Sequence, residues 1–404
     1  MDTTWVKIPD VLFFQQGPGV RNTQYTEQGV KLLNVANLVD GNVDLSTSDR
    51  YISEEEAYGK YKHFLCDAGD FIVASSGIKV EYIDKKMGFI DKTMLPLCMN
   101  TSTIRFKVLD TSKLNIRYFM YYLKSHHFKD QLAIHITGSA QLNYGPSHLK
   151  KMTMPLIELD KQQEIVSTLD KLQSIITHRR TQLEKLDLLV KARFVEMFGD
   201  PELNPYNWDK KPMGDYMTLL TDFSANGSYE YLDSNVKMYD EPNYALMVRT
   251  TDLERNDFVN EVKYIDENAY NVLSKSKVFG NEIIMNKIGS AGKIYLMPVL
   301  NRPVSLGRNV FMFRFNDKIN VIFLYFLLIS DYGKKEIQQH VRGAVTKTIT
   351  KDAARSVRII IPPLDLQTQF ADFVKQVDKS KVAVQKELDK AQMLFDSLMQ
   401  EYFG

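Results

Sequence analysis

The chain has 404 residues, of which 44% are hydrophobic and 25% are charged, a composition typical of soluble globular domains. Lysine and arginine number 51 against 50 aspartate and glutamate, and this balance argues mildly against a protein that binds nucleic acid unaided, because such proteins usually carry a basic field. The longest apolar run, residues 321–329, is about half as long as a membrane span, and the N-terminus lacks the pattern of a secretory signal. We therefore expect a cytoplasmic protein without a membrane segment.

The first half of the chain is expected to fold as an α/β unit. Residues 30–38 and 69–77 are rich in β-forming side chains and are bounded by turns, which is typical of strands. Residues 114–123 are apolar nearly all round and are too long for a typical strand, so they predict a buried helix. A polar, basic cluster follows, and a long amphipathic segment then runs to residue 198.

The second half repeats this order at a fixed distance. Gly343 lies 205 residues after Gly138, and similar spacings relate the motifs on either side of them. Strands are expected over 246–253 and 280–289, and a buried helix over 319–328. Self-similarity at one offset implies two equivalent structural units.

Apolar residues in both amphipathic segments recur in alternating steps of four and three, which is the pattern of a heptad seam. The seam of the first segment includes Ile165, Leu169, Leu172, Ile176, Leu183, Leu186, Val190 and Met197. The seam of the second includes Phe370, Val374, Val377, Leu388, Phe395, Leu398 and Tyr402. Because the two stripes have the same phase, two helices can bury them against each other. Residues 199–206 contain two prolines and a glycine directly after the first seam, which predicts a helix stop and a linker.

The motifs do not define a credible active site. Gly289-Ser290-Ala291-Gly292-Lys293 is similar to the end of a phosphate-binding loop, but the first glycine and the metal-binding hydroxyl of such loops are missing. The equivalent residues 75–79 favour a plainer interpretation, a turn with a basic residue in both halves. Cys66 and Cys98 are isolated, which argues against a disulfide framework or a zinc site, so no metal site is expected.

Recognition chemistry remains, because polar and basic residues gather at corresponding places in the two halves. Arginine and amide side chains read base edges, and lysine binds phosphates. The candidate DNA-binding residues of the first half are Lys79, Gln141, Asn143, Tyr144, His148 and Lys150. Those of the second half are Lys293, Arg308, Arg342, Thr346, Lys347 and Thr348. The alternative is that Asn143 and Thr348 only shape turns and that the lysines are merely solvated.

Two further markers recur in register. The first copy has Gly138-Ser139-Ala140-Gln141 and then Leu159 to Ile165, and the second has Gly343 and then Ile361 to Gln367. Together with two variable halves and two heptad helices, these markers resemble the DNA-specificity subunit of type I restriction-modification systems, over essentially the whole chain. The second copy departs from the family in having Gly-Ala-Val-Thr where Gly-Ser-x-Gln is common.

The resemblance implies two target recognition domains in tandem, residues 1–150 and 200–355, each followed by a spacer helix, residues 151–199 and 356–404. Each domain would read one half of a split double-stranded DNA site, and the helices would pair as an antiparallel coiled coil that sets the spacing. The chain would be non-catalytic and would bind no cofactor. It would dock two methyltransferase subunits, which use S-adenosylmethionine, and motor-nuclease subunits, which use ATP and Mg²⁺.

Two other classes of protein remain open. A DNA methyltransferase or a fused restriction enzyme would require the cofactor and catalytic motifs that we do not find in this sequence. A coiled-coil scaffold that does not bind DNA would explain the heptads, but it leaves the twin polar clusters without a purpose.

Overall fold

The computed structural model describes residues 4–135 and 142–404. Contacts between residues divide the chain into two compact units. Unit 1 comprises Met1–Arg180 and Lys386–Gly404, and unit 2 comprises Thr181–Gln385.

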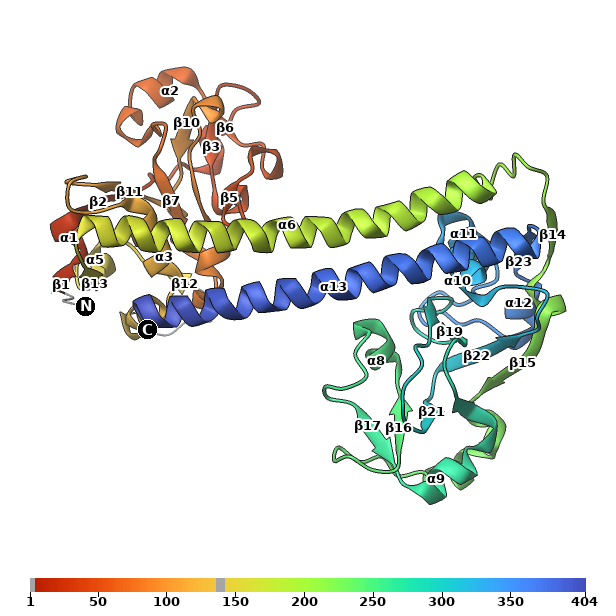
Figure 1. The fold of residues 1–404 in the computed structure, drawn as a ribbon. Coiled ribbons are helices and arrows are strands. Elements are labelled where there is room, and N and C mark those ends of the chain that lie inside the picture. Colours follow the sequence, from red (N-terminus) through yellow and green to blue (C-terminus); the bar gives the residue numbers. More distant parts are fainter. Residues whose placement is uncertain (1–3, 136–141) are drawn as a thin grey trace. The chain divides into compact units, whose positions relative to one another are not determined.

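Two long helices belong to both units (Figure 1). Helix α6 covers Leu159–Phe198 and helix α13 covers Leu364–Phe403, with 40 residues each. Unit 1 contains the first part of α6 and the last part of α13, whereas unit 2 contains the end of α6 and the beginning of α13. Each unit therefore consists of a globule of strands and short helices together with a segment of each long helix.

The globule of unit 1 contains an antiparallel sheet of order β2-β11-β7-β9 and a second sheet of order β10-β3-β6, in which β3 and β10 are parallel. Its elements are β1 Thr4–Lys7, α1 Ile8–Val11, β2 Leu12–Gln16, β3 Val30–Leu33, β4 Leu38–Val39, β5 Asn42–Val43, β6 Tyr51–Ile52, α2 Glu54–Tyr58, β7 Phe71–Ala74, β8 Ser76–Ile78, β9 Met87–Phe89, β10 Leu97–Met99, β11 Thr103–Val108, α3 Ile116–Lys124, α4 His126–His135, β12 Leu142–Asn143, α5 Pro146–Leu149 and β13 Thr153–Leu156. Helix α3 packs on the antiparallel sheet, where the ring of Phe119 lies 5.1 Å from that of Phe106 on β11.

The globule of unit 2 repeats this plan with an antiparallel sheet of order β15-β22-β19-β20 and a second sheet of order β17-β16-β21-β18, in which β16 and β21 are parallel. Its elements are β14 Asp209–Pro212, β15 Met217–Asp222, α7 Tyr229–Asn235, β16 Ala245–Val248, α8 Thr250–Arg255, β17 Lys263–Ile265, α9 Glu267–Val272, β18 Lys277–Val278, β19 Ile283–Asn286, β20 Ile294–Leu296, β21 Val304–Leu306, β22 Val310–Phe315, α10 Val321–Ile329, α11 Asp331–Gln338, α12 Lys351–Ser356 and β23 Arg358–Ile361.

The duplication extends to the register of strand pairs. Trp5 of β1 lies opposite Pro155 of β13, and Lys210 of β14 lies opposite Ile360 of β23, so that both residue numbers are 205 higher in unit 2. The predicted tandem repeat of α/β units, each followed by a long helix, is confirmed. The two predicted buried helices are also confirmed, as α3 and α10.

The first turn of each long helix carries a glutamine whose side chain is fully buried. Gln162 of α6 accepts a hydrogen bond from the backbone N–H of Asn115 at 2.8 Å and donates to the carbonyl oxygen of Ile157 at 2.8 Å. Gln367 of α13 accepts from the N–H of Asn320 at 2.9 Å and donates to the carbonyl oxygen of Pro362. Asn115 and Asn320 cap α3 and α10, so each glutamine joins the start of a long helix to the buried helix of its own globule.

Each long helix ends at a buried phenylalanine. The ring of Phe198 lies 4.7 Å from that of Phe323 on α10, and the ring of Phe403 lies 5.1 Å from that of Tyr118 on α3. Phe403 is 205 residues after Phe198, and Phe323 is 205 residues after Tyr118. Helix α6 begins in unit 1 and ends in unit 2, on α10, whereas α13 begins in unit 2 and ends in unit 1, on α3.

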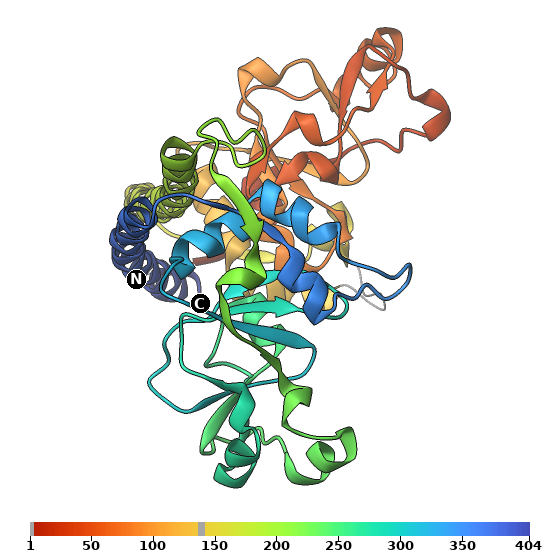
Figure 2. The same ribbon diagram turned by 90° about the vertical axis from the view of Figure 1, so that its right-hand side faces the viewer.

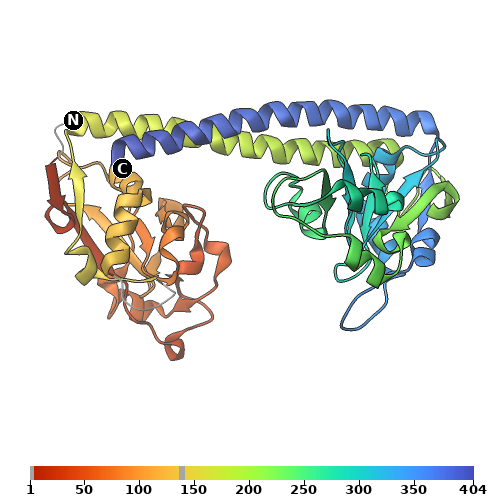
Figure 3. The ribbon, with the colours of Figure 1, turned by 90° about the horizontal axis from the view of Figure 1, so that it is seen from below.

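Within each unit, the segments of α6 and α13 contact each other and lie side by side (Figures 1 and 3). In unit 2 the ring of Phe194 lies 5.4 Å from that of Phe370, and Asp187 forms an ion pair with Lys381 at 2.6 Å, which makes the two segments antiparallel. In unit 1 Arg180 donates to Gln392. A continuous coiled coil along both helices stays a prediction.

Most predicted seam residues are buried. Leu183, Leu186 and Leu398 are only half-buried. The seam was predicted to end at Met197 and Tyr402, but Phe194, Phe198 and Phe403 are buried more deeply. The reason is that the end of each helix packs on a globule, where Phe198 contacts Phe323 of α10 and Phe403 contacts Tyr118 of α3.

The predicted strands are shorter than expected. Residues 246–253 were expected to be one strand, but β16 ends at Val248 and helix α8 begins at Thr250. The Asp252 carboxylate accepts a hydrogen bond from the N–H of Arg249 at 2.8 Å, which stabilises a helix start that strand periodicity does not reveal. In unit 1, directly after β3, the N–H of Asn34 donates to the side-chain oxygen of Asn37 at 3.0 Å.

Candidate nucleic-acid interface

The predicted polar cluster of unit 1 lies where two short strands meet. Strand β12 pairs antiparallel with β8, so that Asn143 lies opposite Ser76, and the N–H of Tyr144 donates to the carbonyl oxygen of Ser75 at 3.0 Å. Lys79 follows β8 directly. The side chains of Lys79 and Asn143 are exposed, so the pairing brings two predicted residues to the same surface.

The cluster of unit 2 has the same construction. Ile288 forms an antiparallel bridge with Thr348, the N–H of Gly289 donates to the carbonyl oxygen of Lys347 at 3.0 Å, and the N–H of Ile349 donates to that of Lys287 at 3.0 Å. Thr348 is 205 residues after Asn143. The fold therefore places these two candidates at equivalent positions, one in each unit.

A tight loop in unit 2 presents several candidates to solvent. The backbones of Arg342 and Thr348 exchange hydrogen bonds of 2.9 and 2.7 Å, which closes the loop at its base. Gly343 has a φ of +104°, a conformation that side chains disfavour, and the side chain of Val345 is 98% exposed at the tip. The loop projects from the globule of unit 2 (Figures 2 and 3) and carries Thr346 with Lys347.

The structure changes the interpretation of some candidates in unit 1. Tyr144 is 1% exposed, so it is a packing residue and its hydroxyl cannot contact DNA in this conformation. Burial raises the pKa of that hydroxyl. His148 accepts a hydrogen bond from the N–H of Gly145 at 3.1 Å, whereas Lys150 is exposed. Gln141 lies outside the described residues.

Lys293 lies on the turn between β19 and β20, beside a cavity of about 570 Å³. Its ammonium group pairs with the carboxylate of Glu254 at 3.4 Å and lies 5.5 Å from the centre of the Tyr295 ring. Burial alone would lower the pKa of Lys293, but these neighbours raise it, so this lysine is charged at neutral pH. Lys334 and Lys347 also line the cavity, which makes it basic.

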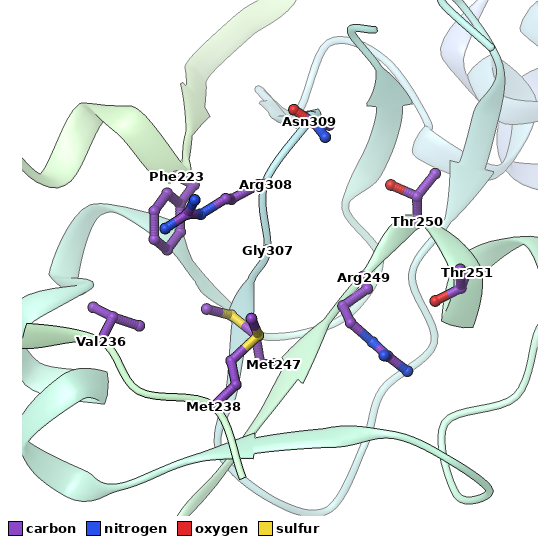
Figure 4. Close-up of a pocket in the computed structure, with 10 residues that line it drawn as sticks. All are labelled: Phe223, Val236, Met238, Met247, Arg249, Thr250, Thr251, Gly307, Arg308 and Asn309. Atoms are coloured by element: carbon purple, nitrogen blue, oxygen red, sulfur yellow. The ribbon is translucent and has the colours of Figure 1, made fainter. Parts of the chain in front are cut away.

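Arg308 lines a second cavity, of about 260 Å³, at the carboxyl ends of the parallel strands β16 and β21 (Figure 4). Its guanidinium group donates to the hydroxyl of Tyr229 at 2.9 Å, forms an ion pair with Asp233 and packs on the Phe223 ring. These contacts fix the direction of the arginine. The cavity is lined by Phe223, Val236, Met238, Met247, Arg249, Thr250, Thr251, Gly307, Arg308 and Asn309.

One charged cluster in unit 2 was not predicted from the sequence. Asp222, at the end of β15, accepts hydrogen bonds from Lys287 at 3.0 Å and from Lys351 at 2.9 Å. Burial works against ionisation of Asp222, but the hydrogen bonds from Lys351, Lys287 and Ser224 outweigh it and hold the pKa of the carboxyl below its ordinary value. These residues are far apart in the chain, so no local motif indicates the cluster.

Other kinds of site were sought throughout the part of the chain that the structure describes. Within residues 4–135 and 142–404, we find no group of three or more His, Cys, Asp or Glu side chains arranged to hold a metal ion. None of the described helices combines the length and the apolar character that crossing a membrane requires.

The fold is that of a protein with two tandem α/β units and two long helices that contact each other within each unit. The sequence matches the family described as the type I restriction modification DNA specificity domain twice, over residues 7–186 and 210–391, and the chain belongs to that family.

Curated relatives from Methanocaldococcus jannaschii are described as type I restriction enzyme specificity subunits. The chain is 24% identical over 186 residues to the type I restriction enzyme MjaVIII specificity subunit, and this match covers 45% of this chain and 42% of that protein. It is 22% identical over 281 residues to the putative MjaX specificity subunit, with 65% and 61% covered. It is 23% identical over 303 residues to the MjaIX specificity subunit, with 70% and 67% covered. The matches thus span less than two thirds of the first two relatives.

Two solved structures share the fold. The crystal structure of the type I restriction-modification S subunit from M. genitalium has a TM-score of 0.58 at 16% identity and covers 100% of this chain and 96% of that one. A chain from work on complex assembly and conformational transition of the type I R-M system has a TM-score of 0.53 at 14% identity, with 99% and 97% covered. At these identities the likeness concerns the fold alone.

Proposed function

We propose that this chain is the DNA sequence-specificity subunit of a type I restriction-modification complex. The globules of unit 1 and unit 2 each read one half of a bipartite double-stranded DNA site. The observation that carries this proposal is the equivalent placement of Asn143, on the strand pair of β12 and β8, and Thr348, on an antiparallel bridge to Ile288.

Equivalent placement with different side chains is what two readers of different half-sites require. The scaffold presents an amide at Asn143 and a hydroxyl at Thr348, and these groups pair with different base edges. Lys79 in unit 1 and Lys347 in unit 2 lie next to them and supply charge for phosphate contacts, which position a protein on DNA without reading its sequence.

The proposal includes partners. The formal net charge of the chain is +1, a weak field for a protein that must hold DNA alone. Two methyltransferase subunits and the motor-nuclease subunits therefore contribute much of the phosphate contact. They also carry out the chemistry with S-adenosylmethionine, ATP and Mg²⁺, while this chain remains non-catalytic and binds no cofactor.

The long helices have a second role in the proposal, which is to set the distance between the half-sites. A helix of 40 residues is about 60 Å long at roughly 1.5 Å per residue. Half-sites one helical turn of DNA apart are separated by roughly 34 Å, so helices of this length suffice.

A domain exchange tests the division of labour. We would replace residues 1–157 with the corresponding segment of another member of the family, because β1 pairs with β13 and the two must be exchanged together. The hybrid would be expressed with its methyltransferase subunits, and the methylated sites mapped across a genome. We expect one half of the recognised sequence to change while the other stays. A change in both halves, or in neither, would contradict the proposal.

The rival class, a methyltransferase or a fused restriction enzyme, is tested on the isolated chain. The purified protein would be incubated with DNA and labelled S-adenosylmethionine, with the complex containing the methyltransferase subunits as the positive control. We expect label in the DNA only with the complex. Transfer by the chain alone would support the rival.

A further inference from the structure

The cluster of Asp222, Lys287 and Lys351 places two cations on one carboxylate. Lys287 Nζ lies 3.0 Å from Asp222 Oδ2, and Lys351 Nζ lies 2.9 Å from Oδ1. The Asp222 side chain is 6% exposed, whereas those of Lys287 and Lys351 are 20% and 36% exposed. One buried carboxylate balances one ammonium group, so the cluster presents one uncompensated positive charge to the surface.

Three separate elements hold the two ammonium groups in place. Asp222 ends β15, Lys287 follows β19, and Lys351 is the first residue of α12. Both ammonium groups also lie over the ring of Phe311, at 5.8 and 6.0 Å from its centre. A lysine on the surface usually loses side-chain entropy when it binds a ligand, and here much of that ordering has already occurred.

The cluster adjoins the candidate interface of unit 2. The carbonyl oxygen of Lys287 accepts a hydrogen bond from the N–H of Ile349, which directly follows the loop of residues 342–348. The N–H of Lys287 donates to the carbonyl oxygen of Asn309, which lines the cavity of Arg308. The backbone of Lys287 thus lies between the projecting loop and that cavity.

Neutral residues take these places in unit 1. Gln16 ends β2 opposite Ile104, as Asp222 ends β15 opposite Phe311. Gln16 donates to the hydroxyl of Ser75 at 3.4 Å, and Ser75 follows β7 as Lys287 follows β19. The third residue is the first of α5.

That third residue is Pro146, which is 205 residues before Lys351. Unit 1 therefore has an amide, a hydroxyl and a proline where unit 2 has a carboxylate and two lysines. The scaffold is shared, so a structural need common to both units does not explain the lysines.

We propose that Lys287 and Lys351 form an anchoring site for a DNA backbone phosphate in unit 2, with Asp222 as the positioning residue, and that unit 1 lacks this site. The inference rests on the proposed function, since it takes DNA as the ligand. It assigns a larger salt-dependent share of binding to the half-site of unit 2. Because phosphate contacts carry no sequence information, the site strengthens binding without changing the sequence that is read.

The test uses the complex of the full chain with its methyltransferase subunits and a DNA duplex containing the recognised site. Affinity would be measured over a series of salt concentrations for the wild type, Lys351→Met and Lys351→Arg. A lost phosphate contact reduces the slope of log affinity against log salt by about 0.9. We expect that reduction for Lys351→Met, with the preference for the recognised site unchanged, and a slope near that of the wild type for Lys351→Arg.

Lys318→Met is the matched control, because Lys318 is exposed beyond the other end of β22 and should leave the slope unchanged. A purely structural role for Lys351 would lower the thermal midpoint and leave the slope unaltered, and this result would overturn the inference. A folded Lys351→Met variant with the slope of the wild type would also overturn it.

A second measurement locates the phosphate. Methylphosphonate would replace single phosphates along the duplex, and we expect one position, in the half-site assigned to unit 2 by the domain exchange, to weaken the wild type but not Lys351→Met. Such a position in the half-site of unit 1 would contradict the asymmetry. If the wild-type complex binds the site specifically and Lys351→Met shows no effect, only this inference is wrong. Absence of specific binding by the wild-type complex would sink the proposed function and the inference with it.

Discussion

Gln367 accepts a hydrogen bond from the backbone N–H of Asn320 at 2.9 Å, and the side chain is fully buried. The same bond joins Gln162 to Asn115 at 2.8 Å in unit 1. Buried polar side chains are retained only where their hydrogen bonds are satisfied, so these contacts fix where each long helix leaves its globule. The glutamine-containing markers, residues 159–165 and 361–367, thus join each long helix to its globule.

The first prediction concerns these glutamine hydrogen bonds. Gln367→Ala leaves the N–H of Asn320 without its partner in a buried site, which costs about 1–3 kcal/mol of unfolding free energy. Denaturant unfolding of the full chain would measure the loss. Gln369→Ala, two residues further along α13 and exposed, is the control and should lie within about 0.5 kcal/mol of the wild type. Equal stability of both variants would show that the Gln367 hydrogen bond does not stabilise the fold.

The second prediction concerns the end of α6. Phe198 is fully buried against Phe323 of α10, so Phe198→Ala removes ring contacts and leaves a cavity that should cost about 3–5 kcal/mol. Val195→Ala, at an exposed position on the same helix turn, should change stability little. A loss below about 1 kcal/mol for Phe198→Ala would contradict the packing of α6 on α10.

The third prediction concerns base reading. Asn143 is exposed and its amide is suited to a base edge, so Asn143→Ala should weaken discrimination at one base pair by about 1–3 kcal/mol. Methylation-site mapping of the complex would show relaxation in the half-site of unit 1 only. Thr348→Ala is the matched variant and should relax only the other half-site. Relaxation of the same half-site by both variants would be incompatible with two separate readers.

The fourth prediction concerns the length of the helices. Seven residues inserted after Arg180 in α6 and after Gln385 in α13 preserve the heptad phase and add about 10 Å, or roughly three base pairs. The methylated site should keep both half-sites and gain a spacer longer by about that amount. Seven residues inserted into the linker 199–206 serve as the control and should leave the spacer unchanged. An unchanged spacer after the helix insertions would rule out a measuring role.

The fifth prediction follows from the lowered pKa of Asp222. A carboxyl whose pKa is lower in the folded state stabilises the fold above its unfolded pKa, roughly 3.9, and this contribution disappears as the pH falls through the folded value. Asp222→Asn should therefore be less stable than the wild type at pH 7, and the difference should narrow below about pH 4. Unfolding curves at several pH values would measure it, with Asp317→Asn as a control at an exposed carboxyl. A difference that stays constant down to pH 3 would contradict the ion pairs.

The sequence by itself determined the duplication, the two buried helices and most of the helix seams. These features depend on local periodicity and on an offset of 205 residues that recurs at motifs in both halves, and both are visible without coordinates. The offset even extends to strand register, as the pairs Trp5 with Pro155 and Lys210 with Ile360 show.

Only the tertiary structure decided which candidates face solvent and which charges meet. Tyr144 looked like a reader of DNA, yet its side chain is buried beneath the cluster to which it was assigned. Lys351 and Asp222 form a contact although they are 129 residues apart in the chain. Burial and ion pairing depend on which distant segments the fold brings together. A side chain's type and its neighbours in the sequence do not carry that information.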